Sequence, residues 1–196
     1  MKYSLVLLLL FCSCAPALGQ SAPSPEITDL AAATVGHQRT AMYVLGGYAL
    51  LNLGGGLLGR AATTGATRRF HEMNALWNTV NLGIAAVGLY GALRADPAGW
   101  SLAEAVGEHH KFGKVLLFNA GLDVGYVAGG LYLLERARRP GADADQLRGY
   151  GRSVMFQGAF LFVFDLVNYA LLARRGPTVD VLLGATEAGL GLTLRF

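Results

Sequence analysis

The chain has 196 residues, of which 53% are hydrophobic and only 15% are charged, with 27 glycines and a formal net charge of +3 at pH 7. A soluble domain usually carries about 25% charged residues, so this composition argues against a soluble domain and favours a multi-pass membrane protein. The positive charges are mostly arginines beside apolar stretches. This placement is typical of topology determinants and not of a nucleic-acid-binding surface.

Residues 1–19 are typical of a cleavable signal peptide. Lys2 precedes an apolar run, and small residues follow that run up to the sequence "ALG". We expect cleavage after about Gly19, which would remove Cys12 and Cys14 and leave no cysteine for disulfides or thiolate metal sites. Lipid attachment at Cys14 is the alternative, although the residues "LFCS" before it fit a lipobox poorly.

Four apolar stretches follow an outer segment at residues 20–39, and each is close to the ~20 residues that a helix needs to cross the hydrocarbon of a bilayer. The predicted spans cover about 40–59, 72–93, 113–134 and 153–173. They predict an all-α fold, an antiparallel four-helix transmembrane bundle over residues 40–176. The tail at 177–196 is predicted to be an amphipathic segment at the membrane interface.

The signal peptide also predicts the orientation of the bundle. Cleavage would place residue 20 outside, so the first and third connectors would lie inside. Both connectors carry arginine clusters, as the positive-inside rule prefers, although the two sides of the chain differ little in total charge. We therefore expect a bacterial cytoplasmic (inner) membrane protein with its N-terminus outside. The inside arginines would be Arg60, Arg68, Arg69, Arg136, Arg138, Arg139, Arg148 and Arg152.

The second connector contains a helix start. Ser101 and Glu104 have the spacing of a capping box, in which each side chain bonds the backbone N–H of the other residue. This pattern predicts a helix that begins near Leu102 and continues into the third span. Such a helix would be longer than the hydrocarbon is thick and would project beyond the membrane on its outer side.

The third span also carries glycines at a spacing of four residues, namely Gly121, Gly125 and Gly129. Small residues at this spacing allow the backbones of two helices to approach closely. The pattern predicts that this face of the third helix packs against a neighbouring helix.

Each predicted span places its polar side chains on one helical face. At 100° per residue, these residues fall within about 80° of one another in the second, third and fourth spans. Polar groups within a span nearly always turn toward the interior of the bundle. The residues are Tyr48 and Asn52 in the first span, His71, Asn74, Asn78 and Asn81 in the second, Asn119, Asp123 and Tyr126 in the third, and Gln157, Asp165 and Asn168 in the fourth.

Asp123 and Asp165 carry the leading functional hypothesis. Each lies near the middle of its span, where an Asp costs about 2.5–3.5 kcal/mol on insertion scales, and no Lys or Arg lies at the same depth. The first hypothesis is a membrane protein that binds or conducts a proton or a cation. The alternative is a structural or partner-interaction protein whose polar core only fixes helix packing. The assisting amides in the first hypothesis would be Asn78, Asn81, Asn119 and Asn168.

A weaker hypothesis is a metal site at the outer end of the third helix. Glu104 and Glu108 lie one turn apart and His109 is adjacent, and carboxylates and imidazoles are ligands of divalent ions. The simpler interpretation is a solvated extension of the helix. The sequence identifies no cofactor, and it lacks the familiar motifs of soluble-type catalysis, which argues weakly against an enzyme.

Three stretches carry a family resemblance: "FHEMNALWNTVNLGIA", "NAGLDVGYVAGG" and "QGAFLFVFDLVNY". They resemble an uncharacterised family of multi-pass bacterial membrane proteins, over most of residues 35–173. The resemblance implies a helical membrane fold and no particular activity. The expected partner is the lipid bilayer, and conduction would require a homo-oligomer because four helices enclose little volume. No protein partner is indicated.

Overall fold

The computed structural model describes residues 23–184, and within them it contains helices and no strand. The predicted signal peptide and the last twelve residues of the predicted tail lie outside the described residues. The all-helical class is confirmed. The elements are α1 (Pro25–Ala62), α2 (Gly65–Arg94), the 3-10 turn η1 (Pro97–Gly99), α3 (Leu102–Arg136), α4 (Ala144–Ala173) and α5 (Gly176–Gly184).

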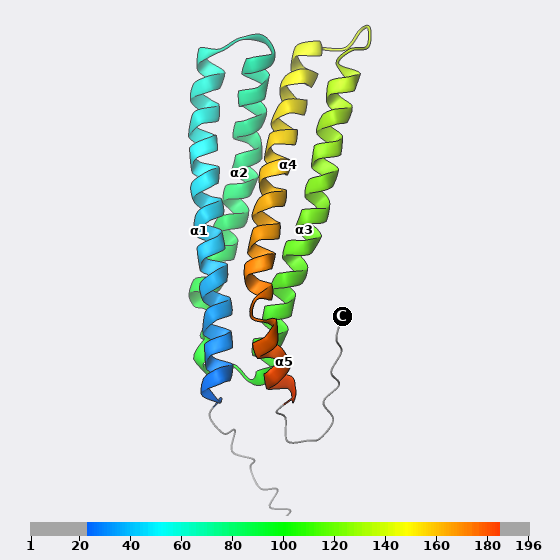
Figure 1. Cartoon of the computed structure of the whole chain (residues 1–196). Coiled ribbons are helices and arrows are strands. Elements are labelled where there is room, and N and C mark those ends of the chain that lie inside the picture. The colour runs from blue at the N-terminus through cyan, green and yellow to red at the C-terminus, as the bar shows by residue number, and fades with distance from the viewer. Residues whose placement is uncertain (1–22, 185–196) are drawn as a thin grey trace, which may run out of the picture.

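The four long helices form a bundle. The α1–α2 and α3–α4 connections lie at one end of it, and the α2–α3 connection lies at the other end together with α5 (Figure 1). Helix α1 packs along α2, α3 packs along α4, and α2 also packs along α4. Contact between α1 and α3 is smaller, and the backbones of α2 and α3 approach each other least of all these pairs. On one side of the bundle, α2 and α3 therefore face each other with little backbone contact between them.

The exterior of the bundle is apolar. All four long helices are long and apolar enough to cross a membrane. They leave large hydrophobic side chains exposed, including Leu51 at 78%, Leu58 at 75% and Val87 at 74%. A soluble monomer rarely exposes contiguous apolar surface of this kind. The length and surface of the helices therefore indicate a membrane protein.

Local sequence signals set where the helices begin. The predicted capping box is confirmed, because the hydroxyl of Ser101 accepts from the N–H of Glu104 at 3.3 Å and the carboxylate of Glu104 accepts from the N–H of Ser101 at 2.8 Å. Helix α3 runs unbroken for 35 residues from this cap, or about 50 Å. Helix α1 is also continuous, so residues 25–39 extend the same helix that contains the first predicted span.

The segments beyond the predicted spans pack together at the α5 end of the bundle. Leu30 and Ala31 of α1 form a buried cluster with Ala105 and Val106 of α3, and α5 adds two further side chains. The α5 residues in this cluster are Val179 and Leu182. Part of the predicted interfacial tail is thus a short helix held against the main bundle.

The predicted packing face at Gly121, Gly125 and Gly129 is wrong. A Cβ atom at any of these three positions would meet nothing within 4 Å. The close approach of α3 to α4 occurs instead at Gly130, and a Cβ at Gly151 would lie 2.8 Å from the Gly130 carbonyl oxygen. The physical reason is that α4 lies on the face of α3 that carries Gly130, so the predicted glycines point away from the bundle.

Candidate functional site

The polar interior contains two adjoining clusters, and the first consists of amides and one phenol. We call it the amide cluster, formed by Tyr48 and Asn52 of α1, Asn74, Asn78 and Asn81 of α2, and Gln157 of α4. The Tyr48 hydroxyl donates to Gln157 Oε1 at 3.0 Å, and Gln157 Nε2 donates to Asn74 Oδ1. Asn74 Nδ2 donates to the carbonyl and side-chain oxygens of Asn52, both at 3.1 Å. These bonds connect three helices.

The rest of the amide cluster follows α2. Asn78 Nδ2 donates to the Asn74 carbonyl at 2.8 Å, and Asn81 Nδ2 donates to Asn78 Oδ1 at 3.4 Å. The side chains of Asn78 and Gln157 are completely buried. Buried amides require partners of this kind, because an unpaired polar group in a low-dielectric interior is costly. The amide cluster therefore supplies its own hydrogen bonds.

The second cluster is the carboxyl pair, Asp123 of α3 and Asp165 of α4. The two residues are only 2% and 5% exposed, and both line the same cavity. Oδ2 of Asp123 is buried and receives no hydrogen bond from any N–H or O–H group in the described part of the chain.

The carboxyl pair lies on the wall of a cavity of about 690 Å³ between α2 and α3. Four of the six residues predicted for the ion or proton site line this cavity: Asn81, Asn119, Asp123 and Asp165. The other two do not. Asn78 belongs to the amide cluster, and Asn168 Oδ1 accepts from His37 Nε2 of α1 at 3.0 Å.

The three candidate metal ligands are each engaged elsewhere. Glu104 bonds Ser101 in the capping box, and Glu108 forms an ion pair with Lys111 at 3.0 Å. His109 is buried, with its Nδ1 atom 3.3 Å from the Thr34 hydroxyl. Within residues 23–184, no group of three or more His, Cys, Asp or Glu side chains is arranged to hold a metal ion.

Aromatic residues complete the cavity, and the sequence analysis did not assign them to the site. Trp77 of α2 and Tyr126 of α3 meet edge to face, with ring centroids 4.7 Å apart, and both line the cavity together with Phe164 of α4. Tyr126 lies three residues after Asp123 and so shares its helical face. No pattern in the sequence assigned Trp77 to the site, because its contact with Tyr126 depends on how α2 and α3 are placed against each other.

The fold and the site define a class, a helical bundle of four apolar helices with a polar interior. Comparison with known proteins then identifies the family. A family of unknown function (DUF6992) matches residues 44–166, and the chain belongs to this family. The matched range contains the whole amide cluster and both members of the carboxyl pair. No match is found among curated proteins or among solved structures.

Proposed function

We propose that this chain is a multi-pass membrane protein that binds a proton or a cation at the carboxyl pair. The supporting observation is the burial of Asp123 and Asp165 beside a cavity without a neutralising basic group. Among the described cavity-lining residues, Lys111 is the one basic side chain. It is largely exposed and already paired with Glu108. A buried acidic pair in this setting favours a positively charged ligand, because attraction is strong where water is scarce.

The test is thermal unfolding of the purified protein in Na⁺, K⁺, Mg²⁺, Mn²⁺ and Zn²⁺ and across pH. A ligand at 100 times its dissociation constant should stabilise the folded state by about 2.7 kcal/mol. We expect at least one of these conditions to raise the melting temperature of the wild type and to leave the Asp123→Asn/Asp165→Asn variant unchanged. A matched control is Asp29→Asn/Asp180→Asn, which removes two exposed carboxylates and should keep the response.

Equal responses of the wild type and of the Asp123→Asn/Asp165→Asn variant would contradict the proposal. So would a wild type that responds to no ion and to no change of pH beyond the response of the variant. In either case the polar interior would serve packing alone.

A second candidate, a packing role, is favoured for the amide cluster. Its amides bond one another across α1, α2 and α4, and its members Asn78 and Gln157 are fully buried. Hydrogen bonds between spanning helices contribute about 0.6 kcal/mol each on average. We therefore assign helix registration to the amide cluster and ligand binding to the carboxyl pair. A structural or partner-interaction protein remains the alternative if the carboxyl pair binds nothing.

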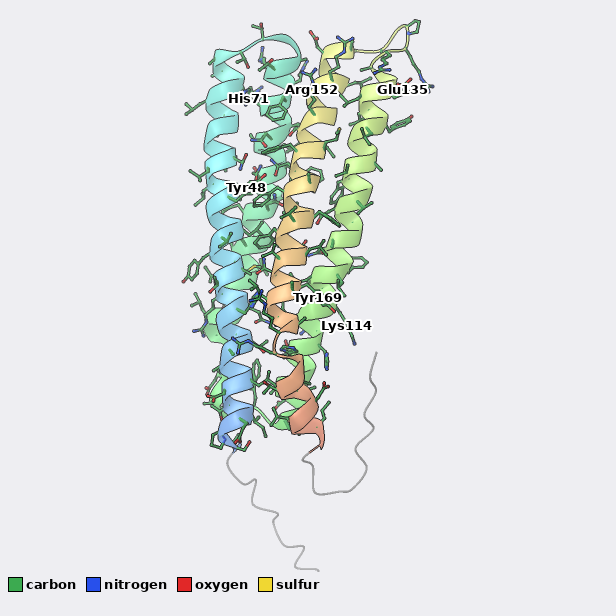
Figure 2. The ribbon with its side chains drawn as sticks, in the orientation of Figure 1. Tyr48, His71, Lys114, Glu135, Arg152 and Tyr169 are labelled. Carbon is green, nitrogen blue, oxygen red and sulfur yellow. The ribbon has the colours of Figure 1, made fainter. Side chains whose placement is uncertain are left out.

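We also propose that the end of the bundle with the α1–α2 and α3–α4 connections faces the cytoplasm, with the N-terminus of α1 outside. The support is the positive-inside rule, because the predicted inside arginines all lie on the helix ends and connections at that end. Arg152 illustrates the placement in Figure 2. The membrane would be the bacterial inner membrane.

Cysteine labelling tests the orientation. In a Cys12→Ser/Cys14→Ser background, Pro140→Cys would mark the α3–α4 connection and Ala98→Cys would mark the α2–α3 connection. Both positions are exposed. We expect a membrane-impermeant maleimide to label Ala98→Cys in intact cells and Pro140→Cys only after permeabilisation. The reverse pattern would overturn the proposed orientation.

A further inference from the structure

The cavity beside the carboxyl pair is open on the side of the bundle. Three residues of α2 line it and are more than half exposed, namely Val80, Ile84 and Val87. From α3, the lining residues Val115 and Leu122 are also exposed, at 48% and 42%. In a membrane, these walls would adjoin the hydrocarbon of the lipids. The cavity therefore combines an entrance suited to apolar groups with an acidic inner wall.

The inner wall of the cavity contains a buried polar atom to which a ligand could bind. Asp123 is 2% exposed and lines the cavity, yet its Oδ2 atom accepts no hydrogen bond within the part of the chain that the structure describes. Buried polar atoms in native structures almost always have a partner. A cationic donor in the cavity would supply that partner and offset the charge of the pair.

The lining does not favour a bare divalent ion. Ca²⁺ takes six to eight oxygen ligands, and Mg²⁺ requires an octahedron. The polar lining beside the aspartates consists mainly of the amides of Asn81 and Asn119, and most other lining side chains are hydrocarbon or aromatic. A large cation with apolar substituents has no such requirement, because it does not have to exchange a complete hydration shell for oxygen ligands.

The aromatic lining matches an organic cation. Trp77 and Tyr126 form the edge-to-face pair that spans α2 and α3, and Phe164 is one residue from Asp165. Aromatic faces attract organic cations, with Trp the strongest, and the attraction grows when water is excluded. A carboxyl pair beside three aromatic rings therefore recognises positive charge that is spread over an apolar body.

We propose that the cavity binds a monovalent lipophilic organic cation. Its charge would lie against Asp123 and Asp165, and its apolar part would lie between α2 and α3, entering from the lipid side. The volume of about 690 Å³ is within the range of roughly 300–1,000 Å³ that small-molecule sites occupy. This inference rests on the proposed cation-binding function and names the chemical class of the ligand.

The test measures binding of tetraphenylphosphonium to the full chain in lipid nanodiscs by equilibrium dialysis, with empty nanodiscs subtracted. Tetraphenylborate is the matched probe, because it has the same shape and apolar surface with the opposite charge. We expect saturable binding of the cation and at least tenfold weaker binding of the anion. The Asp123→Asn/Asp165→Asn variant should bind the cation at least tenfold more weakly than the wild type.

A pair of glycine variants tests where tetraphenylphosphonium binds and leaves the carboxyl pair unaltered. Gly91 and Gly83 both lie on α2, and a Cβ at either position would meet nothing within 4 Å. Gly91 lines the cavity and Gly83 does not. We expect Gly91→Phe to fill the entrance and weaken tetraphenylphosphonium binding at least tenfold, and Gly83→Phe to bind like the wild type.

Equal binding of the two probes, or unchanged binding in Gly91→Phe, would overturn this inference. Its failure is distinguishable from failure of the proposed function. If an inorganic cation or a proton stabilises the wild type through the carboxyl pair while tetraphenylphosphonium does not bind, only the assignment of an organic cation fails. If neither depends on the carboxyl pair, both fail.

Discussion

Replacing Gly149 of α4 by alanine is expected to destabilise the bundle, because the added methyl group would overlap the backbone of α2. A Cβ at Gly149 would lie 2.5 Å from the Ala66 carbonyl oxygen and 2.6 Å from the Phe70 nitrogen. Both are backbone atoms of α2, so no side-chain rotation relieves the overlap and the two helices must separate. Overpacking of this kind costs about 1–3 kcal/mol, occasionally more. Thermal unfolding in detergent measures the loss.

Gly125→Ala is the matched control for this prediction. It adds the same methyl group to a helical glycine with open space around it. Because alanine has less freedom than glycine in the unfolded chain, we expect Gly125→Ala to raise stability by about 0.4–1 kcal/mol. A loss of stability in Gly125→Ala would show that this outward glycine face packs against another chain. Equal stability of Gly149→Ala and the wild type would contradict the α2–α4 contact.

Gln157→Leu is expected to produce the second large loss. Gln157 is fully buried and joins α4 to both other helices of the amide cluster, through Tyr48 of α1 and Asn74 of α2. A leucine would remove both bonds and leave the Tyr48 hydroxyl and an Asn74 oxygen without these partners. Leaving one buried polar group unpaired costs about 1–3 kcal/mol, so we expect a loss in that range, measured by thermal or denaturant unfolding.

Gln146→Leu is the matched control, because it makes the same replacement near the start of the same helix. Only the backbone N–H of Gln146 is involved in the α4 cap, where it donates to Asp143 at 3.0 Å. We expect a change within about 0.5 kcal/mol for Gln146→Leu. If the two variants lost equal stability, the amide cluster would not hold the helices in register.

The sequence predicted the features of the fold that depend on neighbouring residues. Length and hydropathy identified four long helices, because crossing a bilayer requires about 20 apolar residues in a row. The capping box at Ser101 and Glu104 identified the start of α3, because both of its bonds lie within four residues. The sequence did not predict that α1 continues back to Pro25, because residues 25–39 are less apolar than the spans.

Features that depend on the placement of one helix against another were predicted only in part. Helical periodicity grouped Asp165 with Asn168, which are three residues apart, yet Asn168 bonds His37 of α1 and Asp165 faces the cavity. The same periodicity identified glycines at regular spacing in α3 but could not show which face meets α4. Angles along one helix define a stripe, and only the neighbouring helices decide what each residue of the stripe contacts.

The separation of α2 from α3 has a mechanical consequence. The α1–α2 and α3–α4 hairpins are joined mainly through α2 and α4, so we expect any relative rotation of the two hairpins to occur about this contact. The smaller contact between α1 and α3 resists the rotation, through the buried cluster around Leu30 and Val106. Such a rotation would change the width of the opening between α2 and α3 and would break no backbone hydrogen bond within a helix. The two hairpins are thus joined along α2 and α4 and again, near the α5 end, by the buried cluster around Leu30 and Val106.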